Sequence, residues 1–309
     1  QRTRSARYQR GDTRSWKLPH ARRAVAADEE WQGKIVRCLY RPFDWRYVFW
    51  HPAMIDWPRD EMTRHLLHAD FKSQPRGGEG ERGREGETGS SPPLPRSPSL
   101  ALIARRQQLP TQPCTFFWIA DGLALDGVIR SDNRGSESLF PLYSHDTDDG
   151  DQPVSRANFE PRIVTKIAKT VQWSWQPLGS GDLTTNFGPE DLLAYIYALF
   201  HSPNYRQRYA EELRSNFPRI LPPRSAAQFR TFVNFGRELI DLHLLRTLSP
   251  SPSLHLSPSI NEFRAGGYLA LKKWLQPPHR SPADPQYGQI AAAIARTLEI
   301  MDQIDGGMP

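Results

Sequence analysis

The chain of 309 residues allows one large or two modest domains, and its apolar fraction of 38% supports a real core. Two distant cysteines, Cys38 and Cys114, indicate neither a disulfide framework nor a zinc site. No apolar run approaches the roughly 18 residues that a membrane span needs, and the basic start QRTRSARYQR lacks the apolar stretch of a secretory signal. We therefore expect a cytoplasmic protein without a membrane partner. Because the sequence opens on Gln1 rather than Met, we interpret it as part of something longer.

The net charge of +6 is concentrated near the N-terminus. Residues 1–50 hold 12 Lys and Arg against 5 Asp and Glu, whereas residues 51–309 hold 28 against 29. A basic segment of this kind is where an acidic polymer would lie. Of the 40 basic residues 33 are Arg, which suits phosphate and guanine recognition, although a GC-rich genome produces the same bias.

The first 50 residues predict a helix and then an aromatic strand. A helix over 19–27 and a short helix or turn lead into Tyr40–Trp50, where six aromatic rings surround Arg41, Asp44 and Arg46. Aromatic residues favour strands, so we expect a single strand over this range. Its arginines either pair internally, as Arg41 with Asp44, or present a planar fork to a phosphate or a base edge.

The next segments alternate between ordered and polar stretches. A helix is predicted over 54–69, and residues 74–99, rich in Gly, Glu, Arg, Pro and Ser, cannot bury a core. We therefore predict a disordered insertion there. Strands are predicted at Leu100–Ala104, Cys114–Asp121 and Leu139–Ser144 from their apolar and aromatic content.

Residues 146–187 begin with an acidic loop and are interpreted as a linker. From Gly188 onward the pattern is helical: Pro189 and the acids after it start one helix, Ser202 caps another, and an amphipathic helix spans 226–247. A last helix precedes the C-terminus. The sequence thus predicts an α+β fold, with an N-terminal β-rich half over 39–145 that holds a mixed sheet, a C-terminal helical half over 188–309, and one disordered insertion.

The sequence offers little for catalysis. The motifs GxxxxGK[ST], HExxH and GxSxG are absent, and Gly179–Asp182 is interpreted as an ordinary glycine turn. His65 and His68 lie three residues apart on a predicted helix without a recognisable third ligand. We expect His201 and His243, which lie in apolar helices, to be buried and hydrogen-bonded. No catalytic, cofactor-binding or metal-binding residue is predicted in this chain.

Polar side chains on loops after predicted strands are the remaining candidates for function. Arg, Asn and Gln can make bidentate contacts to guanine or adenine edges, and loops held by a sheet are common places for such contacts. Each residue taken alone also fits an ordinary polar loop. Together with two arginines near the aromatic strand, the candidate DNA-binding residues are Arg46, Arg59, Arg105, Arg106, Gln107, Gln108, Arg130, Asn133 and Arg134.

Several motifs occur in the order in which one protein family has them. They are DTRSWKLPHARR (12–23), WQGKIVRCLYRPFDWRYVFW (31–50), the DxPR element Asp56-Trp57-Pro58-Arg59, Ala104-Arg105-Arg106-Gln107 where the family has SRQ, FFWIAD (116–121), FPLY (140–143), the segments 189–220 and 235–245, FRAGGYLALKKWL (263–275) and MDQID (301–305). Over residues 12–305, apart from the insertion, the chain resembles the C-terminal specificity region of type ISP restriction-modification enzymes. Ala104 stands where the family's SRQ pattern has serine, so the alignment of this chain with the pattern can shift by one residue there.

The resemblance implies a DNA target-recognition domain. Type ISP enzymes are single bacterial polypeptides that combine a nuclease, a helicase-like translocase, an adenine methyltransferase and this domain. Residues 39–309 would be the recognition domain, and residues 1–38 a basic helical lead-in from a methyltransferase that the chain does not contain. The implied partners are double-stranded DNA and the methyltransferase, translocase and nuclease domains of the same system.

The methyltransferase motif itself has no match. Such enzymes carry [N/D/S]PP[Y/F], whereas this chain has SPPL at 91–94, LPPR at 221–224 and QPPH at 276–279. S-adenosylmethionine is therefore expected as the cofactor of the attached methyltransferase and not of this chain. Two other functions stay open: a catalytic methyltransferase or nuclease in its own right, and a helical interaction module in which 188–305 docks onto partner domains.

Overall fold

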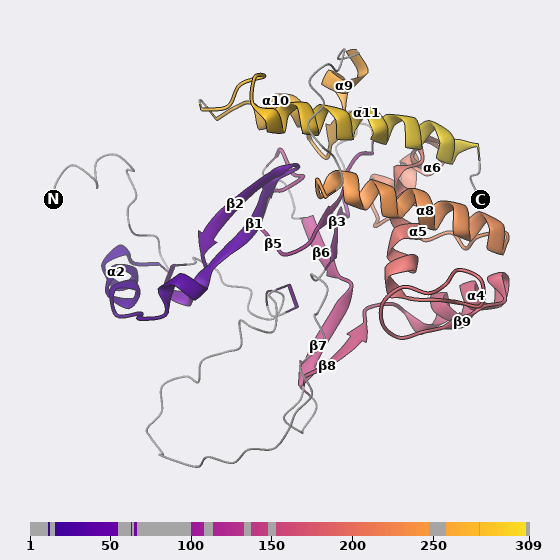
Figure 1. Ribbon diagram of the computed structural model, residues 1–309, viewed down its shortest axis with the longest axis horizontal. Helices are drawn as coiled ribbons and strands as arrows, with labels where there is room; N and C mark the ends of the chain where they lie inside the picture. Colours follow the sequence, from indigo (N-terminus) through magenta and orange to yellow (C-terminus); the bar gives the residue numbers. More distant parts are fainter. Residues whose placement is uncertain are drawn as a thin grey trace.

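Strands gather in the N-terminal half of the protein and helices in the C-terminal half, as Figure 1 shows. The computed structural model describes residues 12, 16–54, 63, 65–66, 100–107, 114–132, 137–147, 153–246, 258–277 and 279–306. The predicted α+β fold with a mixed sheet is confirmed. The predicted insertion at 74–99, and most of the predicted helix over 54–69, lie outside the described residues. No helix among the described residues is long and apolar enough to cross a bilayer.

The elements follow in this order. The N-terminal ones are α2 (Leu18–Ala26), η1 (Trp31–Lys34), β1 (Ile35–Arg41), β2 (Asp44–Phe49), η2 (Pro52–Met54), β3 (Ala101–Arg105), β4 (Phe117–Ala120), β5 (Leu123–Ala124), β6 (Glu137–Pro141), β7 (Tyr143–Thr147) and β8 (Pro153–Ala157). The later ones are α4 (Pro161–Val171), β9 (Ser174–Trp175), β10 (Asn186–Phe187), α5 (Pro189–His201), α6 (Pro203–Arg208), α7 (Ala210–Leu213), α8 (Ala226–His243), α9 (Pro258–Glu262), β11 (Arg264–Ala265), β12 (Tyr268–Leu269), α10 (Ala270–Trp274) and α11 (Pro285–Asp305).

The aromatic segment Tyr40–Trp50 is a hairpin and not the single strand that its composition predicts. β1 and β2 pair antiparallel, with Arg41 opposite Asp44 at the turn, and β5 joins β1 in parallel to give a mixed sheet. Pro42 fixes a negative φ, and Phe43 adopts a φ of 62°, a left-handed conformation rare for a bulky residue. The Phe43 ring is fully buried, 4.9 Å from the ring of Trp118, and this burial offsets the backbone strain.

The second sheet has the order β4-β3-β6, with both pairings antiparallel. All residues of β3 and β4 are buried, so this sheet lies inside the main core. The predicted strand Leu139–Ser144 is in fact divided at Leu142: β6 belongs to this sheet, and β7 pairs with β8 in a separate hairpin that projects away from the helices (Figure 1). The chain changes partner at that point because Pro141 ends the ladder with β3.

The helical half is built on α5, which is buried along nearly all of its length. Its start is fixed by Asp191, whose carboxylate accepts hydrogen bonds from the backbone N–H groups of Gly181 and Gly188. α8 crosses α5 where Gly236 lies against the backbone of Ala194, so closely that a Cβ at residue 236 would collide with it. Ser202 caps α6 as predicted, because its hydroxyl accepts from the N–H of Tyr205.

The segment 146–187, interpreted as a linker from the sequence, is folded over its described residues. It contains β8, α4, β9 and β10, and α4 buries Ile167 and Val171. Trp173 packs against the ring of Phe229 on α8 at 6.0 Å. The apolar residues of α4 recur at helical spacing, a pattern that the acidic start of the segment concealed.

Candidate nucleic-acid interface

Asp44 joins the tip of the β1–β2 hairpin to the C-terminal helical half. Its carboxylate contacts Arg46 at 2.9 Å and Arg280 at 2.6 Å, so the predicted Arg41–Asp44 pair is wrong. Asp44 and Arg46 are two residues apart on a strand and therefore share a face. Burial alone would raise the pKa of Asp44, but the hydrogen bonds from the two guanidinium groups hold it below its usual value.

Arg41 turns instead toward two tyrosines. Its guanidinium carbon lies 4.3 Å from the ring centroid of Tyr40 and 5.4 Å from that of Tyr268, a residue more than 200 positions later. Arg46 stacks on Tyr40 at 3.7 Å, and the Lys273 amine lies 4.9 Å from the centroid of Tyr268. Such cation–π contacts hold flat guanidinium groups against rings without neutralising their charge.

These contacts form one continuous cluster. We call it the arginine–tyrosine cluster, and its members are Tyr40, Arg41, Asp44, Arg46, Tyr268, Lys273 and Arg280. It contains four cations and one carboxylate, which gives a net charge of +3. Burial and the nearby positive charge of Arg41 lower the pKa of Lys273. The cluster therefore concentrates positive charge that its own members do not balance.

The loop over 125–132 holds the cluster in place. The hydroxyl of Tyr268 donates to the carbonyl oxygen of Arg130 and lies 3.4 Å from that of Gly127. The N–H of Gly267 donates to the carbonyl of Ile129 at 2.8 Å. Gly266 has a φ of 61°, and a Cβ there would collide with Ile129, so the close approach requires glycine. The loop that follows β5 is thus fixed directly beside the cluster.

Glu137 is a carboxylate close enough to Tyr268 to raise that residue's pKa, an effect smaller than that of burial. It accepts hydrogen bonds from the backbone N–H groups of Val128 and Ile129, and burial raises its pKa. Its role is to anchor the loop, because both oxygens are engaged by the backbone. It does not form a salt bridge with Arg41 or Lys273 within the described part of the chain.

The structure brings some of the sequence-predicted DNA-binding residues together. Arg105, at the end of β3, is 3% exposed and forms a salt bridge of 3.0 Å with Asp132 in the loop after β5. Arg130 pairs with Asp126 at 2.6 Å in the same loop. Two predicted loops therefore meet, because β3 pairs antiparallel with β6 and the loop over 125–132 precedes β6 in the chain.

The other predicted residues are more scattered. Arg106 and Gln107 are exposed just after β3, and Arg46 belongs to the arginine–tyrosine cluster. Arg59, Gln108, Asn133 and Arg134 lie outside the described residues.

Sequence reasoning missed Tyr268 and Lys273. Their segment, FRAGGYLALKKWL, lies in the half of the chain predicted as helical and was considered only as a family motif. Its signal was the combination of two lysines with a tyrosine and a pair of glycines. That combination indicates a binding site only when the β1–β2 hairpin is known to pack beside it.

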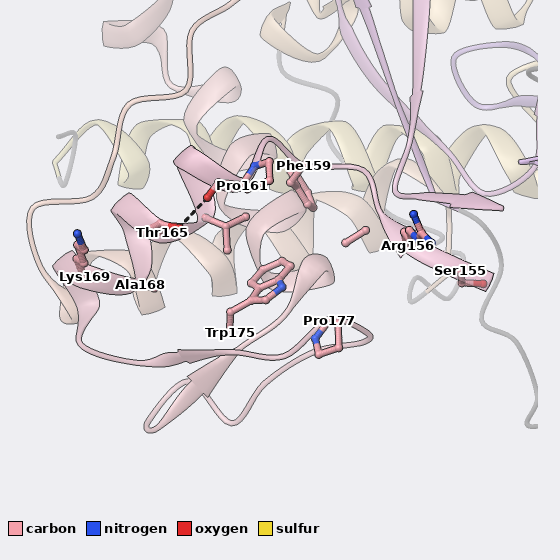
Figure 2. Close-up of a pocket in the computed structure, with 11 residues that line it drawn as sticks. Ser155, Arg156, Phe159, Pro161, Thr165, Ala168, Lys169, Trp175 and Pro177 are labelled. Atoms are coloured by element: carbon pink, nitrogen blue, oxygen red, sulfur yellow. Dashed lines mark hydrogen bonds between the residues drawn. The ribbon is translucent and has the colours of Figure 1, made fainter. Parts of the chain in front are cut away.

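A groove lined by residues of β8, α4 and β9 is a second candidate site. Figure 2 shows Trp175 beneath α4, with Phe159, Arg156 and Lys169 around it. The cavity has a volume of about 690 Å³ and its wall is mostly apolar. No Asp, Glu, His or Cys lines it among the described residues, and its charged lining residues are Arg156 and Lys169.

The buried histidines form a structural network, as predicted for His201 and His243. The hydroxyl of Thr297 donates to Ala293 and so accepts from Nε2 of His243, which leaves Nδ1 of His243 to accept from Tyr197 at 2.6 Å. His201 Nδ1 bonds the backbone carbonyl of Tyr197. Burial lowers the pKa of both imidazoles. Both rings are neutral and shielded from solvent, and they stabilise the helical core.

Comparison with protein families gives a clear result. The model of the type ISP C-terminal specificity domain matches residues 1–71 and 90–257. The chain belongs to this family. No curated protein matches it.

Three solved structures share the fold of this specificity domain. The type ISP restriction-modification enzyme LlaBIII, bound to DNA, is 18% identical with a TM-score of 0.56 over 94% of this chain. A nuclease-deletion mutant of the type ISP enzyme LlaGI, in complex with a DNA substrate mimic, is 16% identical with a TM-score of 0.51 over 88%. The DrdV–DNA complex is 17% identical with a TM-score of 0.57 over 98%. The chain spans only 20%, 24% and 31% of those chains, respectively.

Proposed function

We propose that this specificity domain recognises a short DNA sequence as part of a restriction-modification system. The observation that carries the proposal is its membership of the type ISP C-terminal specificity family. The DNA complexes of LlaBIII and DrdV, which have the same fold, support it. The arginine–tyrosine cluster supplies the excess positive charge that an acidic polymer requires.

The finer part of the proposal concerns methylation. The domain would hold duplex DNA so that an attached methyltransferase, using its own S-adenosylmethionine, extrudes and methylates one adenine. The chain's share of this work is binding and orientation. Its described residues supply cations and amide or guanidinium donors at one edge of the β-rich half.

The test begins with selection from a random duplex library on the purified chain. The recovered sequence is then compared with a scrambled duplex in titrations from 50 to 300 mM KCl. We expect tighter binding to the recovered sequence, with an affinity for both duplexes that falls as salt rises because phosphate contacts release counterions. Binding without salt dependence, or an equal affinity for both duplexes, would contradict sequence recognition.

The groove around Trp175 favours a second candidate function, in which the chain docks onto partner domains without reading bases. Its apolar wall is suited to protein contact more than to a phosphate backbone. Arg106→Gln distinguishes the two functions, since Arg106 is exposed and its loss leaves the core intact. A reduced preference for the recovered sequence supports recognition, and unchanged DNA binding supports docking. Arg105 is unsuitable for this test because it is buried with Asp132.

A further inference from the structure

The arginine–tyrosine cluster has more positive than negative charge, and a bound anion would balance it. Asp44 is shared between Arg46 and Arg280, which leaves Arg41 and Lys273 without a carboxylate partner among the described residues. Both lie within 5.5 Å of the ring centroid of Tyr268. Two like charges held near one ring repel each other, and a bound anion relieves that repulsion.

The donors of these two cations are only partly used. Within the described residues, Arg41 makes one hydrogen bond, from Nη1 to the carbonyl of Tyr40 at 2.6 Å, and its Nε is buried without a partner. Lys273 donates to the side-chain oxygen of Gln276 at 2.7 Å, and its amine has two further hydrogens. Neither side chain is fully buried, so the remaining Nη hydrogens of Arg41 and the amine hydrogens of Lys273 are left for a ligand at the surface, whereas the buried Nε of Arg41 is not.

The surroundings indicate which anion fits. The cluster adjoins the loop over 125–132, which carries Arg130 and is fixed to Tyr268 by that residue's hydroxyl. The cations come from β1 and from α10, and both side chains are only partly buried, so the site faces solvent. A partly exposed site with a stacked guanidinium group suits a polyanion backbone better than a small metabolite.

We propose that Arg41 and Lys273 bind the phosphodiester backbone of DNA and set the position of the loop over 125–132 on the duplex. This inference rests on the proposed function and assigns to it a specific backbone contact. Arg46 and Arg280 support the site through Asp44, and Tyr268 keeps the two cations oriented. Backbone contacts of this kind fix register and carry no sequence information of their own.

The experiment measures the salt dependence of DNA affinity for the wild-type chain and six variants. Arg41→Gln and Lys273→Gln should each reduce the slope of log K against log[KCl] by about 0.9, the value for one phosphate contact on duplex DNA. They should weaken binding to the recovered and scrambled duplexes by the same factor. Lys166→Gln and Arg162→Gln, on the exposed side of α4, remove the same charges far from the cluster and should leave the slope unchanged.

Charge-conserving variants guard against misfolding. Lys273→Arg and Arg41→Lys keep the cation and should keep the slope, whereas a purely structural role would lower affinity in these variants too. A wild-type chain without salt-dependent DNA binding overturns both this inference and the proposed function. Wild-type binding with an unchanged slope in both glutamine variants overturns only the backbone contact.

A second experiment distinguishes binding of free phosphate from binding of the DNA backbone. Thermal unfolding is compared in potassium phosphate and potassium chloride at equal ionic strength. Stabilisation of the wild type by inorganic phosphate, lost in Lys273→Gln and combined with an unchanged DNA slope, would assign the cluster to free phosphate and overturn the DNA contact.

Discussion

The Asp44→Asn substitution tests whether one carboxylate ties the two halves of the domain together. Asp44 is 3% exposed and contacts guanidinium groups from β2 and from the segment before α11. The Arg280 side chain is 12% exposed, so its pair is effectively buried, whereas Arg46 is 42% exposed and solvent screens it. Loss of one partner of a buried pair costs about 3–5 kcal/mol, and an exposed pair contributes less than about 1 kcal/mol.

The expected order of destabilisation follows from these exposures. Asp44→Asn should lose about 3 kcal/mol or more, Arg280→Gln somewhat less, and Arg46→Gln below about 1 kcal/mol. Asp241→Asn is the matched control, because its carboxylate is 38% exposed and lies 3.6 Å from Arg246. Urea unfolding followed by tryptophan fluorescence measures all four variants at pH 7.

The pH dependence provides an independent check. The pKa of Asp44 is lower in the folded chain than in the unfolded chain, so its contribution is fully present above the unfolded value near 3.9. It is lost as pH falls through the folded value. The stability difference between wild type and Asp44→Asn should therefore be constant from pH 7 to about 5 and shrink below about pH 4. A cost equal to that of Asp241→Asn, or a difference that persists to pH 2, would refute the reasoning.

Substitutions at three further residues test the core. Burial and the positive charge of Arg206 lower the pKa of His243 to about 3, whereas a histidine in the unfolded chain titrates near 6.5. The free energy of unfolding should therefore fall by about 2 kcal/mol between pH 7 and pH 5 because of this residue. Urea titrations of His243→Gln should show that this part of the fall is removed. Gly236→Ala should destabilise by about 1–3 kcal/mol despite the better helix propensity of alanine, and a raised Tm would contradict the contact with Ala194. Phe43→Ala should lower the free energy of unfolding by about 3–5 kcal/mol. Phe43→Gly should lower it by about 1 kcal/mol less, because glycine adopts a positive φ freely. If calorimetry shows the reverse order, the backbone at this turn is not strained.

Elements with local signals could be predicted from the sequence. Pro189 and the acids after it start α5, Ser202 caps α6, and the apolar spacing after Ser225 gives α8, because each signal acts within a few residues of its helix. The β1–β2 hairpin has no such signal. Its turn lacks the glycine or asparagine that normally supplies a positive φ, and Phe43 takes that conformation only because its ring has a core to enter.

The pairing of charges could not be predicted for a related reason. Arg41 and Asp44 are close in sequence and even opposite each other in the hairpin, yet Asp44 binds Arg280, 236 residues away. The choice depends on which side chains share a face and on where the C-terminal segment packs. Composition and spacing do not determine either of these, so the arginine–tyrosine cluster is apparent only in the folded chain.

Arg105 and Arg130, both predicted to read bases, differ in the free energy needed to break their existing ion pairs. Arg130 pairs with Asp126, whose side chain is 68% exposed, so solvent screens this ion pair and it contributes below about 1 kcal/mol. Arg105 is nearly completely buried, and breaking its pair with Asp132 would cost about 3–5 kcal/mol. The Arg105–Asp132 pair therefore anchors the loop that carries Arg130. An arginine is available for base recognition only where breaking its existing ion pair costs little free energy.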